Sequence, residues 1–124
     1  MPAPRLLIVE DEFLIRITLA EALADEAFEV LEAGSADEAL AILHHSPVAL
    51  LLTDIRLSGA LDGFALAEAA RKTDPGLPVI FTSGGTDAAQ RERMTARDAF
   101  IAKPYLPSDV CALVRRMMAE ASPG

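Results

Sequence analysis

Two apolar runs, Val48–Thr53 (VALLLT) and Pro78–Ser83 (PVIFTS), constrain the fold of this chain more than any other feature. A strand with one face in water alternates apolar and polar residues, whereas a strand covered on both faces can be apolar throughout. Both runs therefore predict parallel strands with helices on either side. Further apolar runs at Arg5–Val9, Phe28–Ala33 and Ala99–Ala102 supply the remaining strands of such a sheet.

Helical patterns fill the intervals between these runs. They are the stripe Ile15, Leu19 and Leu23; the segment after the capping box Ser35–Glu38; a helix from near Asp62 with Leu66 and Ala70; a weaker pattern over about Thr86–Thr95; and Val110, Leu113, Val114 and Met117, with Ser108 as the N-cap. Each follows the spacing of one helix face or a known cap signature. Five strands alternating with five helices predict an α/β sandwich around a parallel sheet.

The size and charge of the chain limit its class. The 124 residues fit one domain, with a core over about 5–120 and a tail at 121–124. The formal net charge of −8 argues against direct binding to nucleic acid or to an anionic membrane surface. No stretch reaches the roughly 20 apolar residues of a membrane span. The single cysteine, Cys111, excludes an internal disulfide, so we expect a cytoplasmic protein.

Polar side chains gather where the predicted strands end. Glu10 and Asp11 follow the first strand, Asp54 the third and Ser83 the fourth, while Lys103 follows the fifth. Ligands of parallel sheets bind beyond the carboxyl ends of the strands. Carboxylates and a few other oxygen ligands suit Mg²⁺, and the ion would offset the repulsion between neighbouring acids. The sequence therefore predicts a magnesium site at this edge.

Each of these residues also has a simpler explanation. An acid pair after a strand is often a solvated turn, and Asp54 could cap the loop that follows it. Ser83 before two glycines fits a turn, and the Lys103-Pro104 pair could simply stop a strand. A site is favoured because all these strand ends carry suitable groups together.

The segments LLIVEDE, LLLTDIRLSGALDGFAL, PVIFTSGG and AFIAKPY resemble the response-regulator receiver family, the CheY-like phosphoacceptor domains of two-component signalling. The resemblance covers essentially the whole chain. It implies a flavodoxin-like sheet in strand order 2-1-3-4-5 and a single-domain receiver. Such a domain would take a phosphoryl group from a sensor histidine kinase or a histidine phosphotransfer protein. It would then signal by contact with a downstream protein target, with a phosphorylation-dependent dimer as one form.

The same resemblance implies the roles of the acidic residues. Asp54 would be the phosphorylated aspartate and a ligand of Mg²⁺. Asp11 would bind Mg²⁺ directly, Glu10 would act through water, and the backbone carbonyl of Arg56 would complete the protein's ligands. An aspartate can attack a phosphohistidine and form an acyl phosphate, so the chemistry agrees with the assignment.

The remaining family roles fall at the ends of the fourth and fifth strands. Ser83 and Lys103 would each contact a phosphoryl oxygen. Phe100 would take the place of the aromatic switch residue, and Pro104 would follow a cis peptide bond. The resemblance implies a phosphoacceptor that assists its own phosphorylation and dephosphorylation, not an enzyme with an external substrate.

Two stretches depart from the family pattern. Gly63 stands one residue further from Asp54 than is common in the family. The interval from Ser83 to Lys103 is about two residues shorter, and Thr95–Asp98 (TARD) replaces the usual Gly-Ala before the fifth strand. We therefore expect the fourth helix to be short, shifted or mobile.

Two other functional classes stay open at this point. A receiver-like module could act through protein contacts without phosphorylation. A phosphohydrolase of the haloacid-dehalogenase type also uses an aspartate nucleophile, a Ser or Thr, a Lys and Mg²⁺. That class needs a second acid two residues after the nucleophile, where this chain has Arg56.

Overall fold

Five parallel strands form the centre of the molecule, in the order β2-β1-β3-β4-β5. They are β1 (Arg5–Val9), β2 (Glu29–Ala33), β3 (Leu50–Asp54), β4 (Val79–Ser83) and β5 (Asp98–Ala102). The computed structural model describes residues 3–84 and 93–121 of the chain. The strand order and direction confirm the predicted fold. Asp54 is the last residue of its strand, whereas the sequence predicted a strand ending at Thr53.

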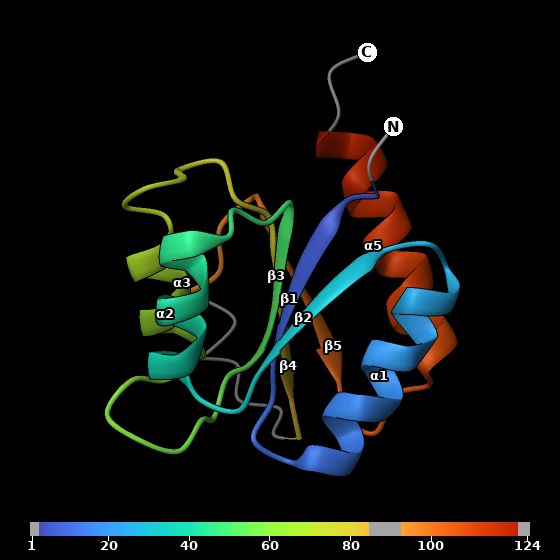
Figure 1. Cartoon of the computed structure of the whole chain (residues 1–124), viewed down its shortest axis with the longest axis horizontal. Coiled ribbons are helices and arrows are strands. Elements are labelled where there is room, and N and C mark those ends of the chain that lie inside the picture. Colours follow the sequence, from blue (N-terminus) through green and yellow to red (C-terminus); the bar gives the residue numbers. More distant parts are fainter. Residues whose placement is uncertain (1–2, 85–92, 122–124) are drawn as a thin grey trace.

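Helices cover both faces of the sheet (Figure 1). On one face lie α1 (Phe13–Asp25) and α5 (Pro107–Ala121), and on the other lie α2 (Ala36–His45) and α3 (Gly63–Ala70). The helix predicted over about Thr86–Thr95 falls mostly on residues 85–92, which are outside the described part of the chain. Within residues 3–84 and 93–121, four of the five predicted helices are therefore present.

The core consists of two apolar layers, one on each face of the sheet. Strands β3 and β4 are buried at every position, as their apolar sequences predict. Leu7 and Leu51 pack toward α2 and α3, while Leu6 and Leu50 pack toward α1 and α5. Alternate residues of one strand thus enter opposite layers, so each strand is fixed in register by both faces.

One predicted helix N-cap, that of α2, is confirmed by the structure, and the one predicted for α5 is not. The Ser35 hydroxyl accepts a hydrogen bond from the Glu38 backbone N–H at 3.1 Å, which confirms the predicted start of α2. The predicted helix α5 is present, but its predicted N-cap was wrong, because the helix begins at Pro107 and Ser108 lies inside its first turn. Proline suits the first helical position, since its φ is already helical and no partner is needed for a backbone N–H.

The carboxyl ends of the strands and the outer ends of β1 and α5 lie on opposite sides of the molecule (Figure 1). The carboxyl ends of the strands lie together at one end of the molecule, whereas the start of β1 and the end of α5 lie at the opposite end (Figure 1). Among the described helices, none combines the length and the apolar character required to cross a membrane.

Candidate functional site

The strand register places the predicted acids side by side. Val9 of β1 is paired with Thr53 of β3, so the next residues along these strands, Glu10 and Asp54, are neighbours. Asp54 is in turn paired with Thr82 of β4, and the following N–H, that of Ile55, donates to the Thr82 carbonyl at 2.9 Å. The backbone of the central strands therefore fixes where both carboxylates stand.

Three carboxylates share this end of the sheet. Glu10 is 3 % exposed and Asp54 8 % exposed, while Asp11 is open to solvent. One oxygen from each of the three lies within 4.8 Å of the others. Like charges at this separation repel unless a cation lies among them, and burial makes that repulsion stronger.

Lys103 supplies a positive charge to this cluster. Its Nζ donates to Glu10 Oε1 at 2.5 Å and to Asp54 Oδ2 at 2.9 Å. The backbone of Lys103 is also fixed, because its N–H donates to the Ser83 carbonyl at 2.9 Å. Burial alone would lower the pKa of Lys103, but the hydrogen bonds and charges of Glu10 and Asp54 outweigh it and raise the pKa. The ammonium is therefore firmly protonated.

Burial has the larger effect on Glu10. It raises the pKa of this carboxyl, and the repulsion of Asp54 acts in the same direction. The ammonium of Lys103 and the Glu12 N–H, which donates to Glu10 Oε2 at 3.2 Å, oppose the shift without cancelling it. Glu10 therefore takes up a proton more readily than an exposed glutamate does.

Asp54 is also fixed by its neighbours along the chain. The Arg56 backbone N–H donates to Asp54 Oδ1 at 3.3 Å, whereas Lys103 donates to Oδ2. Each oxygen of the Asp54 carboxylate therefore accepts a hydrogen bond. Gly63 packs directly on the Asp54 backbone: a Cβ added at this glycine would lie 2.3 Å from the Asp54 carbonyl oxygen. A glycine is required here because no larger residue fits at that distance.

The other predicted residues lie around this centre. Ser83 is buried at the end of β4, next to the strand that carries Asp54. Phe100 is half-buried in β5, in register with Phe81. The Lys103-Pro104 peptide bond is cis, as expected. The roles given to Ser83, Phe100 and the Arg56 carbonyl stay predictions.

The donor chemistry of the site suits a hard divalent cation. The three clustered acids, Glu10, Asp11 and Asp54, offer only oxygen atoms, and one of them is exposed enough to leave room for water ligands. Mg²⁺ prefers this combination of one or two carboxylates with several waters. The residues present therefore fit the ion predicted from the sequence.

Sequence reasoning missed two arginines that organise the surroundings. Arg16 of α1 donates to the Glu10 carbonyl at 2.8 Å and to Glu32 at 3.2 Å. Arg71, just after α3, donates to Asp98 at 2.6 Å and to the Leu77 carbonyl. Nothing in the sequence distinguishes either arginine from an ordinary surface residue, because their partners are distant in the chain.

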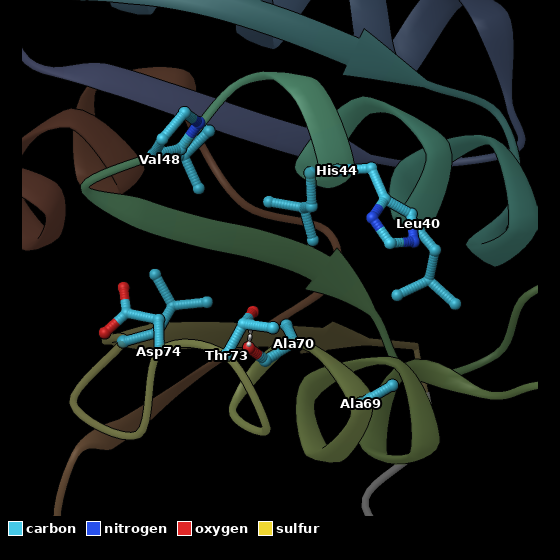
Figure 2. Close-up of a pocket in the computed structure, with 10 residues that line it drawn as sticks. Leu40, His44, Val48, Ala69, Ala70, Thr73 and Asp74 are labelled. Carbon is cyan, nitrogen blue, oxygen red and sulfur yellow. Dashed lines mark hydrogen bonds between the residues drawn. The ribbon is translucent and has the colours of Figure 1, made fainter.

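A cavity of about 330 Å³ lies away from the acidic cluster, between α2 and α3. Figure 2 shows Leu40 and His44 on one side of it, with Ala70, Thr73 and Asp74 on the other. Most of its lining is apolar, and it contains none of the predicted site residues. The acidic cluster is therefore the feature that carries the functional argument.

Comparison with known proteins agrees with this geometry. A profile of the response regulator receiver domain family matches residues 6–115. An NtrX-like response regulator of Rickettsia felis is 39% identical over an alignment of 114 positions that covers 89% of this chain and 24% of that protein. The transcriptional regulatory protein PdtaR of Mycobacterium tuberculosis is 34% identical over 86% of this chain and 52% of its own length.

Solved structures show the same fold. A CheY-like response regulator receiver domain protein of Methanospirillum hungatei superposes with a TM-score of 0.89 at 30% identity, covering 96% of each chain. NtrX of Brucella abortus gives a TM-score of 0.85 at 34% identity, over 96% of this chain and 27% of its own. The present chain thus spans about a quarter of the length of the NtrX-like relatives that it matches.

Proposed function

The chain belongs to the response regulator receiver domain family, and from this premise we propose that Asp54 accepts a phosphoryl group from a phosphohistidine donor. A carboxylate oxygen of Asp54 would attack phosphorus, the phosphorus–nitrogen bond of the donor would break, and an acyl phosphate would form. The donor histidine would keep the electron pair of that bond and take up a proton.

The position of Lys103 is the observation that carries this proposal. Its ammonium reaches both Asp54 and Glu10, so a positive charge stands beside the oxygen atoms that would receive the phosphoryl group. Phosphoryl transfer depends mainly on placing the reactants and on offsetting the charge of the phosphoryl oxygens. On phosphorylation, Lys103 would exchange an aspartate oxygen for a phosphoryl oxygen, and Ser83 would bind another.

Mg²⁺ is part of the same proposal. Glu10, Asp11, Asp54 and the backbone carbonyl of Arg56 would hold it. The bound ion would supply positive charge to the phosphoryl oxygens. Asp11 is the exposed member of the acid cluster, so its carboxylate can bind the cation without first giving up a buried contact.

A protein donor requires a docking surface near the acids. Three large apolar side chains at the edge of the molecule are exposed: Phe13 at 58 %, Leu14 at 75 % and Leu106 at 64 %. Phe13 and Leu14 begin α1, directly after the acid cluster, and Leu106 stands three residues after Lys103. Leu14 lines one cavity together with Tyr105 and Pro107, the chain neighbours of Leu106. Exposed apolar side chains that lie together can mark a protein contact. We propose that the histidine kinase or phosphotransfer protein docks there.

The domain would be a phosphoacceptor that assists its own phosphorylation and dephosphorylation, and the output would be contact with a downstream protein. Cys111 is a buried free thiol, which suits a reducing cytoplasm. Phe100 would repack when Ser83 moves toward the phosphoryl group.

Incubation with Mg²⁺ and acetyl phosphate, followed by intact-mass measurement, tests the phosphoacceptor role. The wild type should gain one phosphoryl group, and Asp54→Asn should gain none because its amide is not a nucleophile. Asp109→Asn is the matched control, since Asp109 is an exposed aspartate in the first turn of α5. This control should be phosphorylated like the wild type.

A purified histidine kinase loaded with phosphate serves as the second donor, because a small donor tests only the chemistry of the acceptor. A gain of mass in Asp54→Asn would show that another residue is modified. Failure of the wild type with both donors would refute the phosphoacceptor role and favour a receiver-like module that works without phosphorylation.

A further inference from the structure

Arg16 connects three segments around the acid cluster. Its side chain extends from the first turns of α1 toward the end of β1 and toward β2. Nη1 donates to the Glu10 carbonyl at 2.8 Å, and Nε donates to Glu32 Oε1 at 3.2 Å. The guanidinium also lies 5.5 Å from the ring centre of Phe13. Gly34 leaves room for it, because a Cβ there would come within 3.3 Å of Nη1.

These contacts fix the peptide that joins Glu10 to Asp11. The Glu10 N–H donates to the Ala33 carbonyl at 3.1 Å, and the Glu10 carbonyl accepts from Arg16, so the Glu10 backbone is held from both sides. The Glu10 carbonyl belongs to the peptide group that leads into Asp11. Rotation of this peptide would swing Asp11, which is exposed and has little packing of its own to hold it.

We propose that Arg16 is a positioning residue for the cation site. It holds the Glu10–Asp11 peptide in the orientation that brings the Asp11 carboxylate within reach of Glu10 and Asp54. The inference rests on the proposed function, because it assumes that these acids bind Mg²⁺. Arg16 would act through the backbone, without touching the ion or the phosphoryl group.

The sign of the effect separates positioning from simple electrostatics. A guanidinium close to the acids repels a second cation, so its loss should strengthen Mg²⁺ binding if charge alone mattered. Loss of a group that orients a metal ligand typically weakens metal binding by about 10-fold to 100-fold. The two explanations thus predict opposite changes for the same substitution.

Calorimetric titration with MgCl₂ would test the proposal on the wild type, Arg16→Met and Arg16→Lys. We expect Arg16→Met to weaken Mg²⁺ binding by about 10-fold. Arg16→Lys should fall between it and the wild type, because a lysine keeps the charge but cannot span both acceptors. Arg5→Met is the matched control: Arg5 pairs with Glu29 at the opposite end of β1 and β2, and its loss should leave Mg²⁺ binding unchanged.

Thermal unfolding without Mg²⁺ supplies the second readout. A purely structural arginine would lower the unfolding temperature of Arg16→Met and leave the Mg²⁺ affinity of the folded protein unchanged, which would overturn the proposal. If Arg16→Met does not fold, Arg16→Lys decides: an affinity equal to that of the wild type overturns it. If the wild type itself binds no Mg²⁺, the proposed function fails and this inference falls with it.

Discussion

Lys103 Nζ and Asp54 Oδ2 lie 2.9 Å apart although 49 positions of sequence separate the two residues. The same ammonium contacts Glu10, which is 93 positions away. A single side chain therefore joins the ends of β1, β3 and β5. The charge balance of the candidate site depends on it, because Glu10 and Asp54 are both buried.

Substitution of Lys103 by methionine should destabilise the folded protein by about 3–5 kcal/mol, since two buried carboxylates lose their cation. Urea unfolding would measure the change in free energy. Lys72→Met is the control: Lys72 is exposed, and among the described residues it makes no ion pair, so its loss should be nearly neutral. Equal losses in both variants would contradict the role of the Lys103 contacts.

Gly63→Ala should destabilise the fold and disturb Asp54. The added Cβ would lie 2.3 Å from the Asp54 carbonyl oxygen, so backbone must shift at a cost of about 1–3 kcal/mol. Helix propensity alone predicts the opposite sign, since alanine favours a helix by about 1 kcal/mol over glycine. Urea unfolding would give the sign, and the rate of mass gain with acetyl phosphate should fall in parallel.

Gly84→Ala is the control for that experiment. Among the residues that the structure describes, leaving out its chain neighbours, no atom lies within 4 Å of the Cβ position at Gly84, and this glycine has no left-handed φ. The free energy of unfolding of the Gly84→Ala protein should therefore differ little from that of the wild type. A Gly63→Ala protein as stable as the wild type would show that the strand end can move away without penalty.

Tyr105 should titrate above its ordinary value of about 10. Burial raises the pKa of this phenol; Glu10 and Asp54 add to the shift, and Lys103 opposes it. Because the chain has one tyrosine and no tryptophan, the ultraviolet absorbance of the phenolate reports this residue alone. The urea-unfolded protein supplies the reference, and a folded midpoint at or below it would contradict the prediction.

The shift at Tyr105 has a defined consequence for stability. The folded state binds the phenolic proton more tightly than the unfolded state does. This contribution is therefore complete below the unfolded pKa of about 10, and it is lost as pH rises through the higher folded pKa.

Arg71→Met should destabilise the protein by about 3 kcal/mol, because it leaves the carboxylate of Asp98 buried without its cation. The Asp98 side chain is 1 % exposed and accepts from Arg71 at 2.6 Å. It also accepts from the Thr95 N–H at 2.7 Å. Urea unfolding would measure the loss, again against Lys72→Met. A combined Arg71→Met and Asp98→Asn variant should regain part of it, and no regain would contradict a charge effect.

The sequence predicted the acid cluster because its members follow directly from strand ends. Glu10, Asp54 and Lys103 each end or follow an apolar run, and the parallel sheet brings such positions to one edge. No knowledge of side-chain packing was needed. The same reasoning predicted the strand order only through the resemblance to a family, because periodicity does not determine which strands are neighbours.

Contacts between distant polar residues could not be predicted in this way. The partners of Arg16 and Arg71 come from other elements, and an arginine in an amphipathic pattern reads as a solvated position. Gly63 was noticed for its spacing, but its reason lies in the Asp54 backbone, which only the packed structure brings close. Thr95–Asp98 replaces the expected Gly-Ala with residues that bind one another and Arg71.

The positions of the start of β1 and the end of α5 affect how this fold can be joined to other polypeptides. β1 begins and α5 ends at the end of the molecule opposite the carboxylates (Figure 1). A polypeptide attached at either place need not cover the acidic edge. One receiver domain can thus serve in chains of very different length without redesign of its acidic edge.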